Sequence, residues 1–282
     1  MTSSTAFNVA TVLYFFAAML YLLFTVLKKE GLGKIGIIVF TVGWLANVTG
    51  FTLRWIESYR MGFGHIPLSN LYESLVFFSI AIGLGYIVLE IWTNIRMLGF
   101  IVVTLAFLSI GYASLPSVSK EIEPLVPALQ SNWLTIHVLT AFLGYSAFAV
   151  SFGISIIYLL KSRAEKNGGV RSKILLAMPD LGMLDEMNYK TVLVGFILLS
   201  LGIITGAAWA NYAWGSYWSW DPKETWSLIT WLIYAAFIHS RLTAGWHGDK
   251  SAILSIAGFL STLFCYLGVN LLLSGLHSYG GN

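Results

Sequence analysis

The imidazole and thiol side chains of this 282-residue sequence, which are common ligands of transition metals, are five histidines and one cysteine. A single thiol can build neither a disulfide nor a structural zinc site within one chain. Cys265 lies in an apolar run, where packing is the usual role of a cysteine. Neutral imidazoles can ligate iron in pairs, one on each side of a flat macrocycle. The candidate ligands are therefore the histidines, His65, His137, His239, His247 and His277.

Tryptophan is concentrated in one short part of the chain. Six of the eleven tryptophans are Trp209, Trp214, Trp218, Trp220, Trp226 and Trp231. Aromatic side chains often anchor a protein at the membrane interface, and that is one interpretation. However, several of these rings fall in segment 211–224, which is too short to span a membrane, and a flat apolar ligand binds against such a set of faces. The spacing favours a set of aromatic rings against which a porphyrin binds.

Two acids near the end of this aromatic segment have the spacing of a helix start. Asp221 suits an N-cap, Pro222 the first helical position and Glu224 the third, which together form a capping box. We expect the acids to shape the loop and the aromatic rings to bind the ligand.

The elements that position these residues are predicted from the composition. The chain is 57% hydrophobic and 10% charged, with a mean hydropathy of +0.77, so lipid is its main solvent. Apolar runs of about 20 residues cross lipid as helices. The sequence predicts an all-α, polytopic integral membrane protein with about eight transmembrane helices in a single membrane domain, 1–282. The predicted segments are Phe7 to Leu27, Ile35 to Leu53, Leu71 to Trp92, Met97 to Leu115, Trp133 to Leu160, Thr191 to Ala210, Thr225 to Ser240 and Ser251 to Ser274.

Basic residues are spread unevenly over the connections between these segments. One alternating set of connections holds 12 of the 16, leaving Arg54, Arg60, Lys120 and Lys223 on the other side. The positive-inside rule makes the richer side cytoplasmic or stromal, and both termini outer. The longest inner loop, 161–190, is basic and Gly-rich and then apolar and acidic, which predicts a flexible turn followed by a short interfacial helix.

This topology assigns each histidine to the outer or the inner side of the membrane. His137 lies near the outer end of the fifth segment and His277 directly follows the eighth, so both share a leaflet with the tryptophans. His239 lies about 21 Å along the seventh helix from its start, near the inner leaflet. A histidine within a span is a functional candidate by default, with snorkelling to the interface as the alternative. His65, in an outer loop, either contacts the edge of a cofactor or holds the loop, whereas His247 is expected to be solvated.

Four stretches, taken together, resemble a known family. WGSYWSWDPKETWSLITW resembles the WWD signature of haem-handling proteins, and its continuation DPKETW resembles the CcsA (ResC) family of system II cytochrome c maturation. GHIPLSNLYESL at 64–75, WLTIHVLTAFLGY and GLHSYG are similar to further stretches of that family, in the same order. The resemblance covers most of the chain.

The resemblance implies a subunit of a cytochrome c synthase that moves haem b outward with a partner, CcsB (ResB). Haem is then presented for thioether attachment to Cys-x-x-Cys-His of apocytochrome c. On this model His137 and His277 ligate an outer haem, and His239 belongs to an inner site that the partner completes. The haem face would lie on the loop from Trp214 to Glu224, with Trp218, Trp220 and Asp221 among its residues. The membrane would be a bacterial inner membrane or a thylakoid, and a thioredoxin-like protein is a possible reductant.

The sequence contains no evident acid–base pair or nucleophile, so we expect catalysis by positioning. Arg54, Arg60 and Lys223 are outer cations that can meet haem propionates, with ordinary surface charge as the alternative. Scattered basic residues do not indicate a nucleic-acid partner. Three alternatives stay open: a relative from the other maturation pathway, a transporter or quinone-linked subunit, and an assembly factor without a cofactor.

Overall fold

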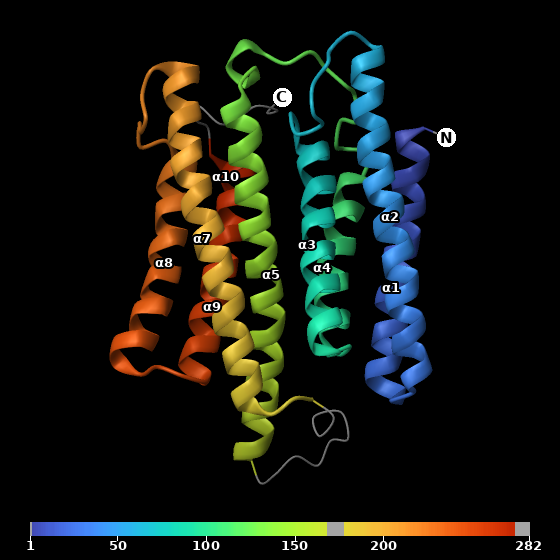
Figure 1. Ribbon diagram of the computed structural model, residues 1–282, viewed down its shortest axis with the longest axis vertical. Coiled ribbons are helices and arrows are strands. Elements are labelled where there is room, and N and C mark those ends of the chain that lie inside the picture. Colours follow the sequence, from blue (N-terminus) through green and yellow to red (C-terminus); the bar gives the residue numbers. More distant parts are fainter. Residues whose placement is uncertain (1, 168–177, 274–282) are drawn as a thin grey trace. The chain divides into compact units, whose positions relative to one another are not determined.

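The structure is a computed structural model that describes residues 2–167 and 178–273, and over these residues it is helical and contains no strand (Figure 1). Each of the eight apolar segments forms a helix, which confirms the all-α membrane prediction. Within the described residues, six helices are long and apolar enough to cross a membrane; α4 is shorter, and α8 is not in this set. The helices are α1 (Ser3–Leu27), α2 (Glu30–Arg60), α3 (Leu71–Thr93), α4 (Leu98–Ala113), α5 (Asn132–Lys166), α7 (Leu181–Trp214), α8 (Pro222–Ala244), and α9 (Asp249–Leu263), which continues through the π-helical turn η2 (Phe264–Gly268) into α10 (Val269–Leu272).

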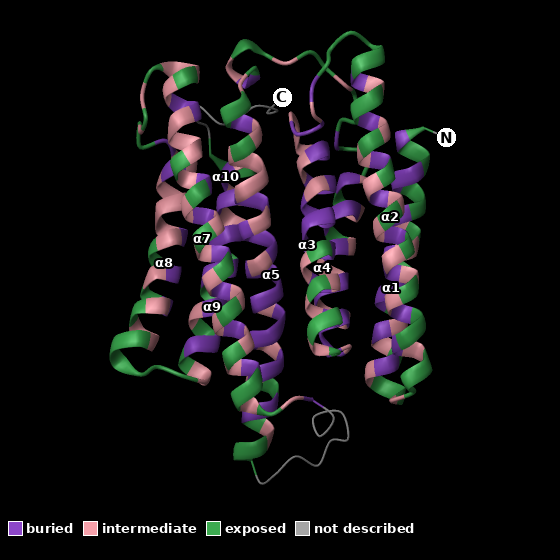
Figure 2. Cartoon of the chain, in the orientation of Figure 1, coloured by how far each residue is buried: buried purple, intermediate pink, exposed green. Residues whose placement is uncertain are grey.

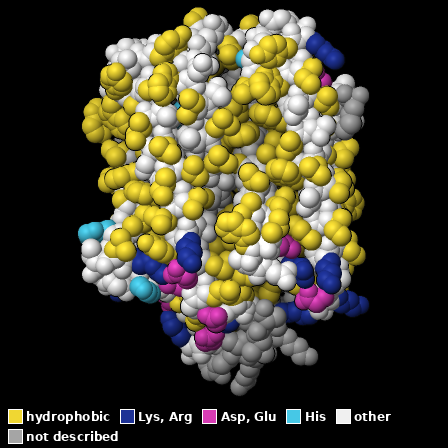
Figure 3. All heavy atoms as spheres, viewed as in Figure 1, with side chains coloured by type: hydrophobic (Ala, Val, Ile, Leu, Met, Phe, Trp, Pro, Cys, Tyr) yellow, Lys and Arg dark blue, Asp and Glu magenta, His cyan; other side chains and the backbone are white. Residues whose placement is uncertain are grey.

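Contacts divide the chain into two compact units, Met1–Gln130 and Ser131–Asn282, which we call unit 1 and unit 2. The single membrane domain, 1–282, stays a prediction. In the space-filling view, hydrophobic side chains run along the helices and most of the visible charged side chains gather near helix ends (Figure 3). This distribution suits a lipid solvent.

Unit 1 packs α1 against α2 and α4, and α3 against α4 and α2. Its interior contains a buried carboxylate, Glu90, near the end of α3. The Tyr21 hydroxyl donates to Glu90 at 3.0 Å, Tyr86 also donates to it, and Arg96 Nε lies 3.5 Å from its other oxygen. Because a buried charge is costly unless it is paired, these contacts account for an acid inside an apolar bundle.

Unit 2 is built around the pair α5 and α7, with α9 packed on α5 and α8 on α9 and α7. The central helix is α5, and Figure 2 shows buried residues along much of its length. Glycines allow α5 and α7 to approach closely. A Cβ at Gly144 would lie 3.1 Å from the carbonyl oxygen of Gly195, and one at Gly202 would lie 3.3 Å from the backbone of Ala141. Small residues at helix crossings are the usual means of tight packing in membranes.

The structure differs from the prediction at the inner loop. Residues 168–177 of this loop lie outside the described residues, and in the described part the acidic stretch from Leu181 belongs to α7, which runs to Trp214. Asp180 caps this helix by accepting from Met183 N at 2.8 Å, and Arg241 pairs with Asp185 at 2.7 Å. A capped start, a paired charge and no proline after the cap let the acidic stretch extend the apolar helix.

The α5–α7 crossing predicts unequal effects of two Gly-to-Ala substitutions. Gly144→Ala pushes a methyl group against the α7 backbone and should lower the free energy of unfolding by about 1–3 kcal/mol, measured by unfolding in detergent. Gly111→Ala in α4 is the control, because its Cβ would lie 3.9 Å from the nearest side-chain atoms. This control should be neutral or slightly stabilising. Equal losses in both variants would contradict the crossing geometry.

Candidate functional site

A cavity of about 70 Å³ lies in unit 2, at the end where α7 finishes and α8 begins. We call this the loop end, after the loop 215–221 that joins the two helices. Helices α5, α7 and α8, the loop and the π-helical turn η2 all contribute to its walls. The lining includes the polar or reactive side chains of His137, Tyr145, Trp218, Lys223, Glu224 and Cys265.

His137 is held on the wall of the cavity by α7. Its Nδ1 lies 2.7 Å from the carbonyl oxygen of Gly202, and since a carbonyl can only accept, Nδ1 carries the proton and donates. In the neutral ring Nε2 is then the unprotonated nitrogen, the form that ligates a metal. Gly206 makes room for the ring, because a Cβ there would lie 2.6 Å from Nδ1, and Trp209 stacks on it with centroids 6.0 Å apart. The geometry fixes both the tautomer and the orientation of the imidazole.

The tryptophans divide into three groups. Trp214 packs edge-on against Trp209 at 5.1 Å, next to His137. Trp218 lines the cavity and meets Trp220 edge-on at 5.7 Å, while Trp220 is 68% exposed and has a positive φ of 59°. Trp226 instead packs against Phe264 in η2 and Trp231 against Phe196 in α7. Trp218 lines the cavity, Trp209 and Trp214 pack behind His137, and Trp226 and Trp231 contribute to the helix packing.

The predicted capping box is confirmed. Asp221 Oδ1 accepts from the backbone N–H of Lys223 at 2.9 Å, and Glu224 accepts from the backbone N–H of Asp221 at 3.2 Å. Glu224 also accepts from the backbone N–H of Ser219 at 2.7 Å, which ties the loop to the start of α8. Both carboxylates are buried, and their hydrogen bonds shape the loop.

Sequence reasoning did not place Tyr145 and Cys265 at this site. The Tyr145 hydroxyl lies 3.9 Å from Cys265 Sγ, and both line the cavity. Cys265 is buried, in agreement with the packing role expected of it, but it belongs to a π-helical turn. Such turns are rare in proteins overall, but those that occur are often at functional sites. The sequence around Cys265 contains no signal for one.

The other histidines in the described part of unit 2 lie away from His137. His239 lies about 22 Å along α8 from Glu224, at about 1.5 Å per residue. It is exposed, on a helix face that also exposes Leu232 and Ala236. His247 is exposed in the connection after α8, as expected. The predicted partner of His137, His277, lies outside the described residues.

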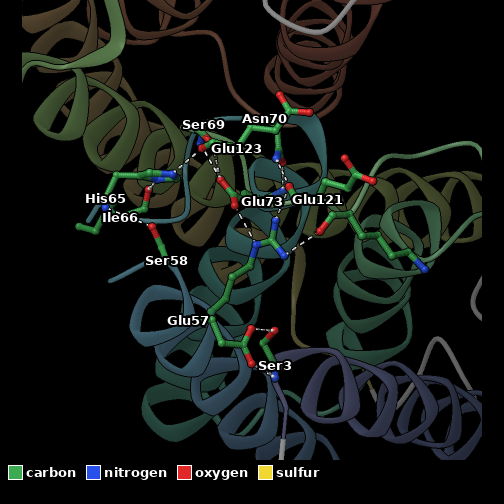
Figure 4. A network of polar contacts seen from close by, with 12 residues as sticks. Ser3, Glu57, Ser58, His65, Ile66, Ser69, Asn70, Glu73, Glu121 and Glu123 are labelled. Atoms are coloured by element: carbon green, nitrogen blue, oxygen red, sulfur yellow. Dashed lines mark hydrogen bonds and ion pairs between the residues drawn. The ribbon is translucent and has the colours of Figure 1, made fainter. Parts of the chain in front are cut away.

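His65 belongs to a polar network in unit 1 (Figure 4). It is 6% exposed, and its two ring nitrogens each lie 2.9 Å from a carbonyl oxygen, of Ile66 and of Glu123. Its backbone N–H donates to Ser58. These contacts favour the alternative in which His65 holds the loop.

Arg54, one of the predicted outer cations, is held in the same network. Arg54 Nε lies 2.7 Å from Glu73, and its other nitrogens donate to the carbonyl oxygens of Lys120 and Glu121 at 3.0 Å. Glu73 also accepts from the backbone and hydroxyl of Ser69, both at 2.8 Å. Arg54 is therefore neutralised inside unit 1, and the stretch GHIPLSNLYESL has a structural role at the start of α3.

Comparison with known proteins gives the following matches. Residues 68–277 match the family model described as Cytochrome C assembly protein. The chain is 44% identical over 243 residues to the cytochrome c biogenesis protein CcsA of Guillardia theta, a match that covers 80% of this chain and 79% of the relative. It is 42% identical over 257 residues to CcsA of Chlorella vulgaris (81% and 80% covered) and 42% identical over 254 residues to CcsA of Prochlorococcus marinus strain NATL2A (81% and 79%).

Among solved structures, the cytochrome c haem lyase CcmF matches with a TM-score of 0.71 at 16% identity. The match covers 95% of this chain and 49% of CcmF, so this chain spans about half the length of CcmF. At this identity the likeness is one of fold.

The buried ion pair of Arg54 and Glu73 in unit 1 predicts how the free energy of unfolding changes when one partner or both charges are removed. Arg54→Met leaves Glu73 as an unpaired buried carboxylate and should cost about 3–5 kcal/mol in the free energy of unfolding. Adding Glu73→Gln removes that charge while its amide oxygen can still accept from Ser69, so the double variant should recover part of the loss. Unfolding in detergent measures both. A double variant no more stable than Arg54→Met would contradict the pairing.

Proposed function

Because this chain belongs to the cytochrome c assembly protein family, we propose that it holds haem at the outer face of its membrane and presents it to apocytochrome c. A role in cytochrome c maturation follows from the family. The observation that carries the haem proposal is the imidazole of His137, whose tautomer and orientation are fixed beside an aromatic loop. The second axial ligand in this proposal is His277.

The cavity is smaller than the roughly 300–1,000 Å³ of a typical small-molecule pocket, so it does not enclose a porphyrin. The ring therefore lies at the cavity mouth, on the loop that carries Trp218 and the exposed Trp220. Flat aromatic faces suit a flat apolar ligand. Trp214, Asp221 and Glu224 support this loop, through the packing on Trp209 and the capping box.

The chemistry proposed for this site is addition of two client thiols to the haem vinyl groups. Each addition forms one carbon–sulfur bond, and the thiol hydrogen ends on the neighbouring vinyl carbon, so no leaving group is required. The client supplies the Cys-x-x-Cys-His motif. The contribution of this chain is to keep the iron ligated and to orient the vinyl groups toward the thiols, which is catalysis by proximity.

We propose a second haem site at His239, completed by a histidine of the membrane partner CcsB. In this proposal lipid surrounds the exposed face of α8, where the imidazole of His239 is costly unless a histidine of a partner helix completes a haem site with it. Haem b would pass from this inner site to the outer one. The proposed membrane is a bacterial inner membrane or a thylakoid, with a thioredoxin-like protein as a possible reductant of client thiols.

An assembly factor that binds no haem is the second candidate function, since tryptophans can serve as an interfacial anchor. A transporter is less well supported, because the buried Glu90 is held by Tyr21, Tyr86 and Arg96. An absorption spectrum separates the haem and haem-free proposals.

The test is the absorption spectrum and pyridine haemochrome of the chain purified in detergent with its membrane partner. Wild type should contain low-spin b-type haem, and His137→Ala with His277→Ala should lose most of it. His247→Ala is the matched control, because His247 is exposed far from the cavity. Wild type without haem, despite an intact partner, would favour the assembly factor.

A second prediction tests the orientation of His137 without removing it. Gly206→Ala places a methyl group within 2.6 Å of Nδ1 and should displace the ring from the Gly202 carbonyl. We expect loss of outer haem, or a shift from a low-spin to a high-spin spectrum, in a protein that remains folded. An unchanged spectrum would argue against His137 as an oriented ligand.

A further inference from the structure

The ammonium group of Lys223 has an unusual position for a positive charge. Lys223 lines the cavity, and its Nζ donates to Asn270 Oδ1 at 2.8 Å, which is a neutral acceptor. Over residues 2–167 and 178–273, no carboxylate lies within 4.0 Å of this ammonium. The adjacent acids accept from backbone groups, Asp221 from Lys223 N and Glu224 from Ser219 N and Asp221 N. A half-buried ammonium that donates to a neutral acceptor favours an anion as its further partner.

The other outer cations of the described chain are differently placed. Arg54 is paired with Glu73, and Lys120 donates to the Ser114 carbonyl, both within unit 1. Arg60 is exposed on α2. Among the described residues that line the cavity of His137, Lys223 is the one Lys or Arg.

The π-helical turn η2 allows two side chains of one helix to contact Lys223. Cys265 Sγ contacts the Lys223 carbonyl oxygen at 3.7 Å, and Asn270 contacts its Nζ. Positions five apart point in different directions on an α-helix, at about 100° per residue, whereas a π-turn brings i and i+5 onto one face. The turn therefore directs both side chains toward the start of α8.

We propose that Lys223 is a positioning residue that binds a carboxylate arm of the porphyrin, with Asn270 orienting its ammonium. This inference rests on the proposed function and names the part of the ligand that enters the cavity. A space of about 70 Å³ accepts a short acidic arm and not the macrocycle. Since His137 lines the same cavity, the arm and the iron are held together, and the vinyl groups are left away from the cavity.

The test compares haem with its dimethyl ester, in which both carboxylates are neutral. Affinities are measured by Soret titration of haem-depleted protein, purified as the full chain with its partner. Wild type should bind haem about 10–100-fold more tightly than the ester, the range of a charge-assisted hydrogen bond. Lys223→Gln should bind the two ligands about equally, with its ester affinity unchanged from wild type, which also shows that the variant is folded.

Two further variants sharpen the comparison. Lys223→Arg keeps the charge and should recover part of the preference for haem. Lys120→Gln removes an outer lysine that does not line the cavity, and it should keep the wild-type preference.

The outcomes separate the two proposals. If wild type prefers haem and Lys223→Gln keeps that preference, or if wild type binds haem and ester equally, the inference about Lys223 is overturned while haem binding stands. If wild type binds neither ligand, the proposed function itself fails.

Discussion

The close approach of α5 and α7 is the constraint on which the rest of unit 2 depends. Gly144, Gly202 and Gly206 lie where a side chain would collide with the facing helix or with His137. Because the helices are this close, the Gly202 carbonyl reaches the imidazole and sets its tautomer. The same approach brings Trp209 against the ring and encloses the cavity between α5, α7 and α8. In a bilayer, where burial of apolar surface does not drive helices together, such contact geometry is a main source of association.

Much of the architecture was predictable because lipid restricts what the chain can form. Each apolar run became a helix, and the capping box at Asp221 and Glu224 followed from residue types that satisfy backbone N–H groups. The inner loop was harder, since the amphipathic stretch from Leu181 reads as interfacial but is continuous with an apolar helix. Local pattern cannot distinguish a separate helix from an extension, because the difference depends on contacts such as that of Arg241 with Asp185.

The candidate site was predictable in part. His137 and the aromatic loop were identified from type and position, and the structure brings them together at one cavity. The sequence could not show that Arg54 is neutralised by Glu73 while Lys223 faces a cavity, because these cations look alike until tertiary contacts are known. Nor could it show the π-helical turn that directs Cys265 and Asn270 to the same neighbour.

The loop 215–221 is closed by its own hydrogen bonds. Gly215 caps α7 in the left-handed conformation by donating to the Asn211 carbonyl, and Glu224 holds Ser219 and Asp221 from the other side. Such a loop loses little conformational entropy when a ligand arrives, and it regains little when the ligand leaves. A surface of this kind suits repeated turnover, because one ligand can be exchanged for the next without refolding between cycles.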